Sequence, residues 1–333
     1  AWIMAVVMLF TICVFGGNGT AEAAATTPVA KHGRLSVKGA DLVDSKGNKF
    51  QLRGISTHGI NWDVGSPYVN KKAFKTLRDD WGVNAIRLAM YTEEYNGYCS
   101  GGSQAKLRKL VDKGVGYATD LGMYAIIDWH ILSDGNPNKN KSQAKKFFTT
   151  MAKKYKNNKN VIYEICNEPN GCGWKEIKSY ATDIIKTIRK YDKKAVIIVG
   201  TPTWSQLGTD GTSNEVADSP IKGYKNIMYS LHFYASEWAH NEYLPAKVAY
   251  ARKKKLPIIV SEFGLSPASG DGAINKASAD KWMKLLNKYN ISYFCWSLSN
   301  KNESASLLKP STKKTSGWKS GDLSTAGKYI KKK

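Results

Sequence analysis

The sequence predicts a (β/α)8 barrel with a short N-terminal β-hairpin, and three observations lead to this fold. Eight short runs are almost wholly apolar and rich in β-branched side chains, which is typical of parallel strands buried on both faces. Segments with helical spacing of apolar residues lie between these runs, and such alternation indicates an α/β fold. The alternation runs through eight repeats with apolar strands, which favours a closed barrel over a doubly wound sheet, and polar and aromatic residues gather at the carboxyl ends of the runs, where a barrel keeps its chemistry. No linker or repeat divides residues 33–333, so we expect them to form one domain.

The hairpin is predicted from a turn-rich stretch near the N-terminus. Residues 44–48, with the sequence Asp-Ser-Lys-Gly-Asn, lie between strand-like residues 35–37 and 49–52. The barrel strands are then expected at 52–55, 85–89, 124–129, 161–166, 195–199, 227–233, 257–262 and 292–297.

Helices are expected between these strands, at 71–80, 104–121, 141–155, 174–191, 243–254 and 277–290. In the second of them, Leu107, Leu110, Val111 and Val115 recur at helical spacing with charges between them. The helix after Thr201 is weak in sequence and is expected to be short or irregular, and residues 320–333 are expected to supply the last helix.

The composition fits a large folded domain with a basic surface. Hydrophobic residues make up 42% of the 333 residues, and the formal charge is +23, from 50 Lys and Arg against 27 Asp and Glu. A polyanionic partner would account for such a charge, but the lysines are spread over segments 139–159, 186–194, 253–255 and 331–333. That distribution indicates a solvated outer ring, and no nucleic-acid-binding motif is present, so we expect no nucleic acid partner.

The N-terminus predicts export. Residues 2–15 are almost wholly apolar and are followed by Ala21-Glu22-Ala23, a small-residue cleavage pattern, so residues 1–23 are interpreted as a secretory signal peptide truncated at its start. The run is short for a membrane span, which leaves a retained anchor as the weaker alternative. The mature protein is expected to be secreted, free of the membrane and monomeric, with residues 24–32 as a flexible lead-in.

Four cysteines remain after Cys13 is removed with the signal peptide. Cys166 and Cys295 lie in strand-like runs and are expected to be buried thiols. Cys99 and Cys172 lie in loops near glycines that we place on one face, so a disulfide between them is compatible with export. No C-x-x-C pair is present, and a zinc ribbon is not expected.

The residues at the strand ends are polar or aromatic to a degree that a packed core does not require. They are His58, Trp62, Arg87, Tyr91, Asp128, Trp129, His130, Asn167, Glu168, Trp204, His232, Tyr234, Ser261, Glu262 and Trp296. Because a barrel keeps its chemistry at the carboxyl ends of its strands, this set predicts an active site there.

Two of these residues are carboxylates on different strands. Pro169 cannot continue a central strand, so Glu168 is expected at the tip of the strand at 161–166, where an acidic helix cap is the alternative. Glu262 ends the strand at 257–262. Hydrolysis of a glycosidic bond needs such a pair, and a separation of about 5–5.5 Å would indicate retention of configuration, whereas a wider gap would indicate inversion.

Seven motifs together resemble those of glycoside hydrolase family 5, of the bacterial endoglucanase (cellulase A) type. They are Leu52-Arg53-Gly54, Ile86-Arg87, Asp128-Trp129-His130, Asn167-Glu168-Pro169, His232-Phe233-Tyr234, Ser261-Glu262-Phe263-Gly264 and Trp296-Ser297. The resemblance runs from about residue 33 to residue 330. It implies a retaining endo-β-1,4-glucanase that acts on β-1,4-glucan polysaccharides or oligosaccharides without a cofactor or metal.

The resemblance also implies roles for individual residues. Glu168 would be the acid/base and Glu262 the nucleophile, with Arg87 and Tyr234 hydrogen-bonded to Glu262 and Asn167 holding the 2-hydroxyl of the sugar being cleaved. His130 and His232 would position the substrate and the two carboxylates, and His58 would contact the neighbouring sugar. Trp62 and Trp296 would stack on glucose rings, while Tyr91 and Trp204 would line the cleft. Lys301 and Glu303 would reach the hydroxyls of distal sugars. A cis peptide is also expected after Trp296. No role aligns with Trp238.

Three other functions stay open at this point. A β-mannanase or mixed-linkage β-glucanase would use the same two glutamates. A metal hydrolase built on His58, His130 and His232 would need a closely spaced His-x-His and a bridging lysine on a strand, which the sequence lacks. A non-catalytic carbohydrate-binding barrel predicts loss of a catalytic carboxylate, whereas Glu168 and Glu262 are both present.

Overall fold

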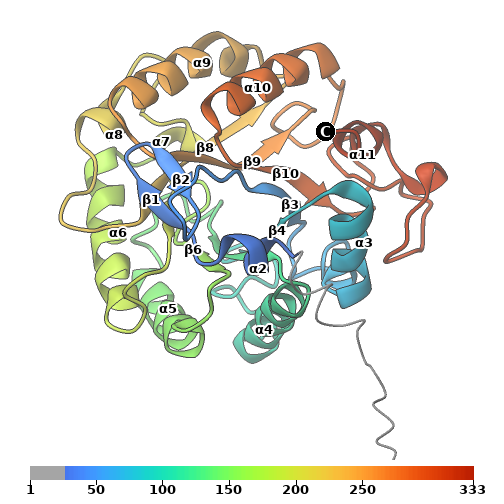
Figure 1. Cartoon of the computed structure of the whole chain (residues 1–333), viewed down its shortest axis with the longest axis horizontal. Coiled ribbons are helices and arrows are strands. Elements are labelled where there is room, and N and C mark those ends of the chain that lie inside the picture. Colours follow the sequence, from blue (N-terminus) through green and yellow to red (C-terminus); the bar gives the residue numbers. More distant parts are fainter. Residues whose placement is uncertain (1–26) are drawn as a thin grey trace, which may run out of the picture.

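A closed barrel of eight parallel strands forms the centre of the computed structural model, which describes residues 27–333. Neighbouring strands follow the order β10-β3-β4-β5-β6-β7-β8-β9 (Figure 1). Their bounds are β3 Arg53–Thr57, β4 Ala85–Tyr91, β5 Tyr124–His130, β6 Val161–Glu164, β7 Ile197–Val199, β8 Ile227–Tyr234, β9 Ile258–Gly264 and β10 Tyr293–Leu298. All eight predicted strands are therefore confirmed, and every residue in them except Arg53 is buried.

An outer ring of helices surrounds the barrel (Figure 1). The helices are α3 Lys71–Trp81, α4 Gln104–Asp120, α5 Lys141–Tyr155, α6 Trp174–Arg189, α7 Pro202–Ser205, α8 Glu215–Asp218, α9 Trp238–Lys253, α10 Lys276–Tyr289 and α11 Thr325–Ile330, with short 3-10 turns at Ser66–Tyr68 and Ser320–Asp322. The helix predicted to be weak after Thr201 is replaced by two four-residue helices, α7 and α8. Helix α9 begins five residues earlier than predicted, and this places its first turn at the carboxyl end of β8.

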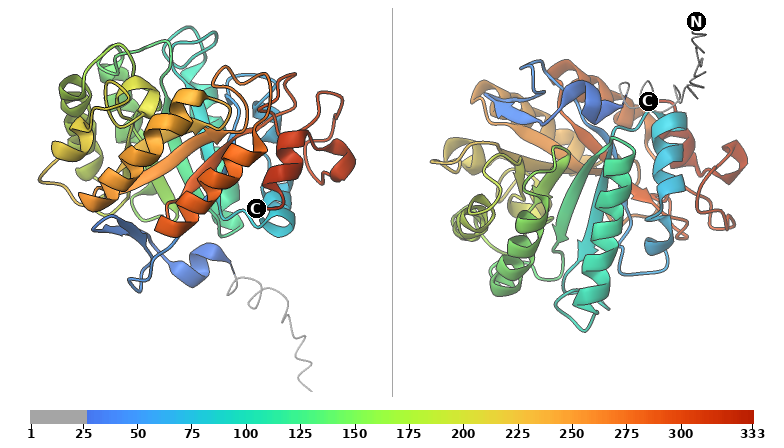
Figure 2. Two further views of the ribbon diagram at one scale, coloured as in Figure 1. Left: turned by 90° about the horizontal axis from the view of Figure 1, so that it is seen from above. Right: turned by 60° about the horizontal axis from the view of Figure 1, so that its bottom comes forward.

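The hairpin exists, but its pairing differs from the prediction. Strands β1 (Ser36–Lys38) and β2 (Asp41–Val43) pair across a turn at Gly39, whose φ of 60° favours glycine. The stretch at 44–48 makes a second turn that ends in a single bridge between Val43 and Lys49. The hairpin lies across one end of the barrel (Figures 1 and 2), and apolar residues of this segment, Leu35, Leu42 and Phe50, pack against strand residues such as Tyr124 and Phe294.

The prediction of a flexible lead-in is wrong for residues 27–32, the part of it that the structure describes. Residues Pro28–His32 form helix α2, with Thr27 at its N-cap. The N–H of Val29 donates to the carbonyl of Gly122 at 2.9 Å, and His32 Nδ1 lies 3.1 Å from Asp44 Oδ2. A capping threonine and a proline in the first turn favour the start of a helix. The prediction missed this helix because it relied on the small, polar composition of the segment.

The predicted signal peptide lies outside the described residues. Within residues 27–333, no helix combines the length and the hydropathy that a bilayer crossing requires.

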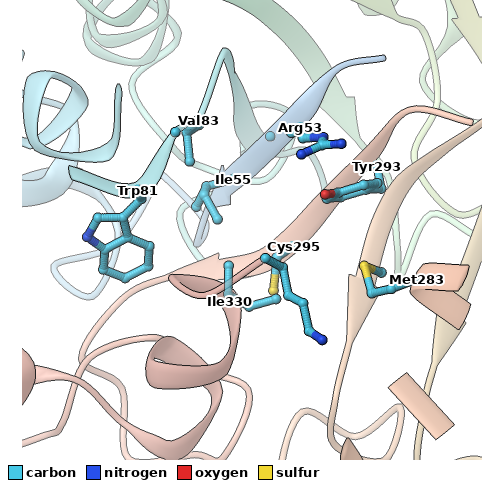
Figure 3. Close-up of a pocket in the computed structure, with 11 residues that line it drawn as sticks. Arg53, Ile55, Trp81, Val83, Met283, Tyr293, Cys295 and Ile330 are labelled. Carbon is cyan, nitrogen blue, oxygen red and sulfur yellow. The ribbon is translucent and has the colours of Figure 1, made fainter. Parts of the chain in front are cut away.

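A small cavity of ≈ 100 Å³ lies at the amino ends of β3 and β10, beside α3 and α11 (Figure 3). Arg53, Trp81, Tyr293, Cys295 and Ile330 are among its lining residues, and none of the residues that line it is acidic. This cavity is at the opposite end of the strands from the predicted active site.

Candidate active site

The segment that carries Glu168 leaves the barrel earlier than the sequence predicted. Strand β6 ends at Glu164, so Glu168 lies beyond the strand and not at its tip. The segment is instead held by β5, because the N–H groups of Asn167 and Glu168 donate to the carbonyls of Trp129 and Ile131 at 3.2 and 3.4 Å. Gly200 permits this path, since a Cβ there would lie 2.3 Å from the carbonyl oxygen of Cys166.

The two predicted catalytic carboxylates face each other at the carboxyl end of the barrel. One oxygen of Glu168, one oxygen of Glu262 and a ring nitrogen of His232 all lie within 4.8 Å of one another. Glu168 comes from the segment after β6 and Glu262 from β9, so only closure of the barrel brings them together. The pair is therefore spaced for chemistry on one sugar unit.

Glu262 is held in place by two donors. The Nη1 atom of Arg87 donates to its Oε2 at 3.0 Å, and the hydroxyl of Tyr234 donates to its Oε1 at 2.7 Å. These are the contacts that the family resemblance implied. Both oxygens are thus fixed in direction, one of them by a charge-assisted hydrogen bond from a guanidinium.

Arg87 is fully buried and contacts five polar groups at once, of which the Ser56 hydroxyl, 3.4 Å from Nη1, is the most distant. Besides Glu262, it donates from Nε to Glu164 at 2.7 Å and from Nη2 to Asn167 at 2.6 Å, and Nη2 lies 3.1 Å from Asp128. Burial acts to lower the pKa of Arg87, but the surrounding carboxylates outweigh it and raise that pKa. The guanidinium is therefore a permanent cation at the floor of the site.

Sequence reasoning gave no role to Glu164 or Asp128, although both are completely buried in this network. The sequence did contain a feature that could have indicated a role, because each is an acidic residue within or at the end of a buried strand. A buried carboxylate requires a partner, and Arg87 is the cation that provides it.

Glu168 is set up as a proton donor. Burial raises the pKa of its carboxyl to about 8, opposed by Arg87 and reinforced by Asp128 and Glu164. Its Oε1 lies 2.8 Å from Nδ1 of His232, a ring whose pKa burial lowers to about 4. At neutral pH the carboxyl is therefore protonated and the imidazole is neutral.

The far side of the His232 ring fixes its tautomer. Nε2 lies 2.9 Å from the Ser261 hydroxyl oxygen, and that hydroxyl donates to Glu164 at 2.6 Å. The serine oxygen then accepts from Nε2–H, which leaves Nδ1 without a proton. A bare Nδ1 can bond to Glu168 only when the carboxyl carries the proton. Ser261 is a positioning residue that the sequence motif contained but did not explain.

His130 and Asn167 form a second ordered pair. Nδ1 of His130 lies 2.6 Å from Asp128, and its Nε2 lies 3.2 Å from the Asn167 amide nitrogen. Burial lowers the pKa of His130 to about 3, so the ring is neutral. The Asn167 amide also donates to the carbonyl of Ile131 at 3.1 Å, and its orientation toward the centre of the site is thereby fixed.

Aromatic rings form one wall of the site. The ring centroids of Trp62 and Tyr91 lie 4.5 Å apart, those of Tyr91 and His130 lie 4.1 Å apart, and Trp296 stacks on His130 at 5.3 Å. The peptide after Trp296 is cis, as the resemblance implied. Flat apolar faces of this kind suit the faces of pyranose rings.

The charged residues predicted for distal hydroxyls lie next to this wall. The Nε2 atom of His58 is 3.6 Å from Glu303 Oε1, and Lys301 forms an ion pair with the other oxygen of Glu303. Both His58 and Glu303 are buried, whereas Lys301 is half exposed. These three residues can offer donors and acceptors to a sugar beyond the cleaved bond.

Trp204 lies on the other side of the carboxylates. It shares a cavity of ≈ 350 Å³ with Glu168, His232 and Tyr234, and it is 43% exposed. Its backbone has a φ of 53°, and its N–H donates to the carbonyl of Pro169 at 3.0 Å. The structure thus divides the predicted aromatic residues between two sides of the catalytic pair.

The predicted disulfide is not formed in the structure. Cys99 and Cys172 are both free, half-buried thiols, and each packs against the main apolar core. Burial raises the pKa of Cys99 to about 12 and that of Cys172 to about 11, so both stay protonated. Sequence placed the two on one face but gave no distance between them. Cys166 and Cys295 are buried thiols, as predicted.

Among the described residues, Glu168, His232 and Glu262 form the group whose spacing could hold a metal ion. Glu262 is already neutralised by Arg87, and His232 Nδ1 faces a protonated carboxyl. A second cation in this place would meet the Arg87 charge, so the arrangement fits proton transfer better than metal binding.

Comparison with known proteins agrees with this geometry. The family model described as Cellulase (glycosyl hydrolase family 5) matches residues 43–302. An endoglucanase of Clostridium saccharobutylicum is 47% identical over 99% of this chain and 70% of its own length, and endoglucanase A of Butyrivibrio fibrisolvens is 45% identical over 90% and 68%.

Solved structures give the same result. A cellulase structure matches with a TM-score of 0.86 at 39% identity, covering 92% of this chain and 93% of its own. The catalytic domain of a Thermobifida fusca endoglucanase in complex with cellotetraose matches with a TM-score of 0.85 at 36% identity, covering 92% and 98%. The chain therefore belongs to the cellulase family, glycoside hydrolase family 5.

Proposed function

We propose that this protein is an endo-β-1,4-glucanase that cleaves internal bonds of cellulose and related β-glucans with retention of configuration. The observation that carries the retaining mechanism is the approach of Glu168 and Glu262 oxygens to within 4.8 Å. That spacing agrees with the roughly 5–5.5 Å of retaining enzymes and is shorter than the about 6.5–9.5 Å that separates the carboxyl groups of inverting enzymes.

The reaction takes two steps. Glu262 attacks the anomeric carbon while Glu168 gives its proton to the departing glycosidic oxygen, so a glycosyl ester forms and the C–O bond to the leaving sugar breaks. Glu168, now a carboxylate, takes a proton from water, whose oxygen attacks the anomeric carbon and releases Glu262. Arg87 and Tyr234 donate to the two Glu262 oxygens and orient them for the attack.

β-1,4-Glucan is the substrate class that the family and its relatives support best. The two relatives described above are named endoglucanases, and the aromatic wall of Trp62, Tyr91 and Trp296 fits flat equatorial sugar faces. A β-mannan differs at the 2-hydroxyl, where the fixed amide of Asn167 is expected to act. No observation favours the mannanase or mixed-linkage alternative.

Two glutamine variants and one product analysis test the proposal. Glu168→Gln and Glu262→Gln should each abolish most turnover on carboxymethyl cellulose, and proton NMR of early products should show the β-anomer first. A panel of carboxymethyl cellulose, lichenan, xylan and galactomannan ranks the substrates. Near-native turnover by Glu262→Gln, or the α-anomer as first product, would contradict the mechanism.

We also propose that the enzyme is exported and acts as a monomer. Support for export comes from the apolar residues 2–15 and the small-residue pattern at 21–23. Cellulase activity in the medium of a secreting host, compared with and without residues 1–23 behind an initiator methionine, tests export. Light scattering during gel filtration tests the monomer.

A further inference from the structure

The cavity beside Glu168 contains a histidine to which neither the sequence nor the mechanism gives a role. His240 lies in the first turn of α9 and lines the same ≈ 350 Å³ cavity as Glu168 and Trp204. The residue is 9% exposed and is therefore buried at the edge of this cavity.

This cavity lies on the leaving-group side of the cleft. A general acid protonates the oxygen that departs with the leaving sugar, so that sugar must lie beside the acid. Glu168 lines the cavity and Glu262 does not. This placement of the leaving sugar rests on the proposed function, because it takes Glu168 as the general acid.

The backbone fixes which nitrogen of His240 carries its proton. The N–H of Tyr234 donates to Nδ1 of His240 at 2.9 Å, so Nδ1 is an acceptor and carries no proton. Burial lowers the pKa of the ring, which is therefore neutral at neutral pH and holds its one proton on Nε2. Within residues 27–333, no hydrogen bond to that Nε2 is present.

The helix that carries His240 is held on both sides. Glu237, at the N-cap of α9, accepts the N–H of Ala268 at 2.7 Å, and both residues line the cavity. The Asn241 amide donates to the carbonyls of Ala235 and Glu237 at 2.9 Å. The ring is thus a fixed donor, and a fixed donor loses little entropy when it binds a hydroxyl.

We propose that His240 is a substrate-binding residue whose Nε2–H donates to a hydroxyl of a glucosyl unit on the leaving-group side, next to the Trp204 ring. The aromatic ring and the adjacent donor are the combination that recognises a sugar, an apolar face with hydroxyls at its edge.

A purely structural role must be separated from this one. In that case His240 would only accept the Tyr234 N–H and so hold the Tyr234 hydroxyl on Glu262, which would affect every substrate alike. Two substrates with the same trisaccharide on the nucleophile side distinguish the roles. Cellohexaose, followed as release of cellotriose, places sugars on the leaving-group side, and β-cellotriosyl fluoride places none there.

Two variants divide the functions of the ring. His240→Asn keeps an acceptor at the Nδ1 position and removes the Nε2–H donor, whereas His240→Gln keeps a donor at the Nε2 position and removes the Nδ1 acceptor. We expect His240→Asn to lower the ratio of kcat/KM for cellohexaose to kcat/KM for the fluoride about three- to tenfold, the effect of one hydrogen bond, and His240→Gln to preserve that ratio. His32→Asn, at the opposite end of the barrel, is the matched control.

An unchanged ratio in His240→Asn, or an equal fall in His240→Gln, would overturn the proposal. A wild-type enzyme that cleaves the fluoride but not cellohexaose would contradict the endoglucanase function itself, which is a different result from a changed ratio in the His240 variants. Wild-type protein gives a test that needs no variant to fold. The 15N–1H signal of His240 Nε2 should shift when cellotriose is added as product, and an unmoved signal at saturating cellotriose would also overturn the proposal.

Discussion

His232 Nδ1 lies 2.8 Å from Oε1 of Glu168, and this contact connects Glu168 to Glu262 through hydrogen bonds and two ion pairs. From His232 the connection passes through Ser261 and Glu164 to Arg87, and Arg87 donates to Glu262. The side chains of Glu168 and Glu262 are thus held by one continuous network.

Activity on oligosaccharides should fall as pH rises through about 8. Burial raises the pKa of Glu168 to about 8, so the proton needed by the leaving oxygen is present below that pH and is lost above it. The measurement is kcat/KM for cellohexaose between neutral and alkaline pH. β-Cellotriosyl fluoride, whose leaving group needs no proton, should lack this alkaline limb. The same limb with both substrates would assign it to another group.

Ser261→Ala should shift that alkaline limb to lower pH. Without the serine oxygen, the His232 proton is free to move to Nδ1 and donate to the Glu168 carboxylate, which favours its charged form. We also expect kcat to fall about tenfold, as for loss of one positioning contact in general acid catalysis. Ser230→Ala is the control, since Ser230 bonds Ser261 without contacting His232. A pH profile that matches wild type would refute the tautomer assignment.

Arg87→Met should both destabilise and inactivate the enzyme. It leaves the buried carboxylates of Glu164, Asp128 and Glu262 without their cation, and breaking a buried ion pair costs about 3–5 kcal/mol. Arg87→Lys restores the charge but cannot donate to three partners in a plane, so it should recover part of the stability and little turnover. Urea unfolding and kcat on carboxymethyl cellulose measure the two effects. Full activity in Arg87→Lys would show that the fork geometry is dispensable.

Phe50→Ala should cost stability and spare catalysis. Phe50 is buried against His32 and Tyr124 at the amino end of the barrel, so its truncation should lower the free energy of unfolding by about 3 kcal/mol. Conservation of turnover is expected because the chemistry lies at the other end of the strands. Tyr95→Ala, at an 81% exposed ring, should change stability by less than about 0.5 kcal/mol. A matching loss of kcat in Phe50→Ala would mean that the packing of Phe50 at the amino end of the barrel also orders the active site.

The sequence located the site well where a residue ends an apolar run. Glu262 and His232 were predicted in this way and Arg87 from its place within an apolar run, and each lies within the network described. It failed where the backbone leaves the ladder. Strand β6 ends at Glu164, and the apolar character of Ile165 and Cys166 hid this end, because both are buried in the core without belonging to a strand. Helix α2 was missed for a related reason, since a five-residue helix is stabilised by its cap and its docking on Gly122 rather than by a periodic apolar face.

What the sequence by itself determined is the number and order of the barrel strands and which side chains stand at their carboxyl ends. Buried parallel strands must be nearly continuous apolar runs, so each strand can be recognised from the composition of its own run. Only the tertiary structure decided the approach of Glu168 and Glu262 to within 4.8 Å, the partners of Arg87, the free state of Cys99 and Cys172 and the tautomers of His232 and His240. These depend on distances between residues far apart in the chain, and such distances exist only once the barrel has closed.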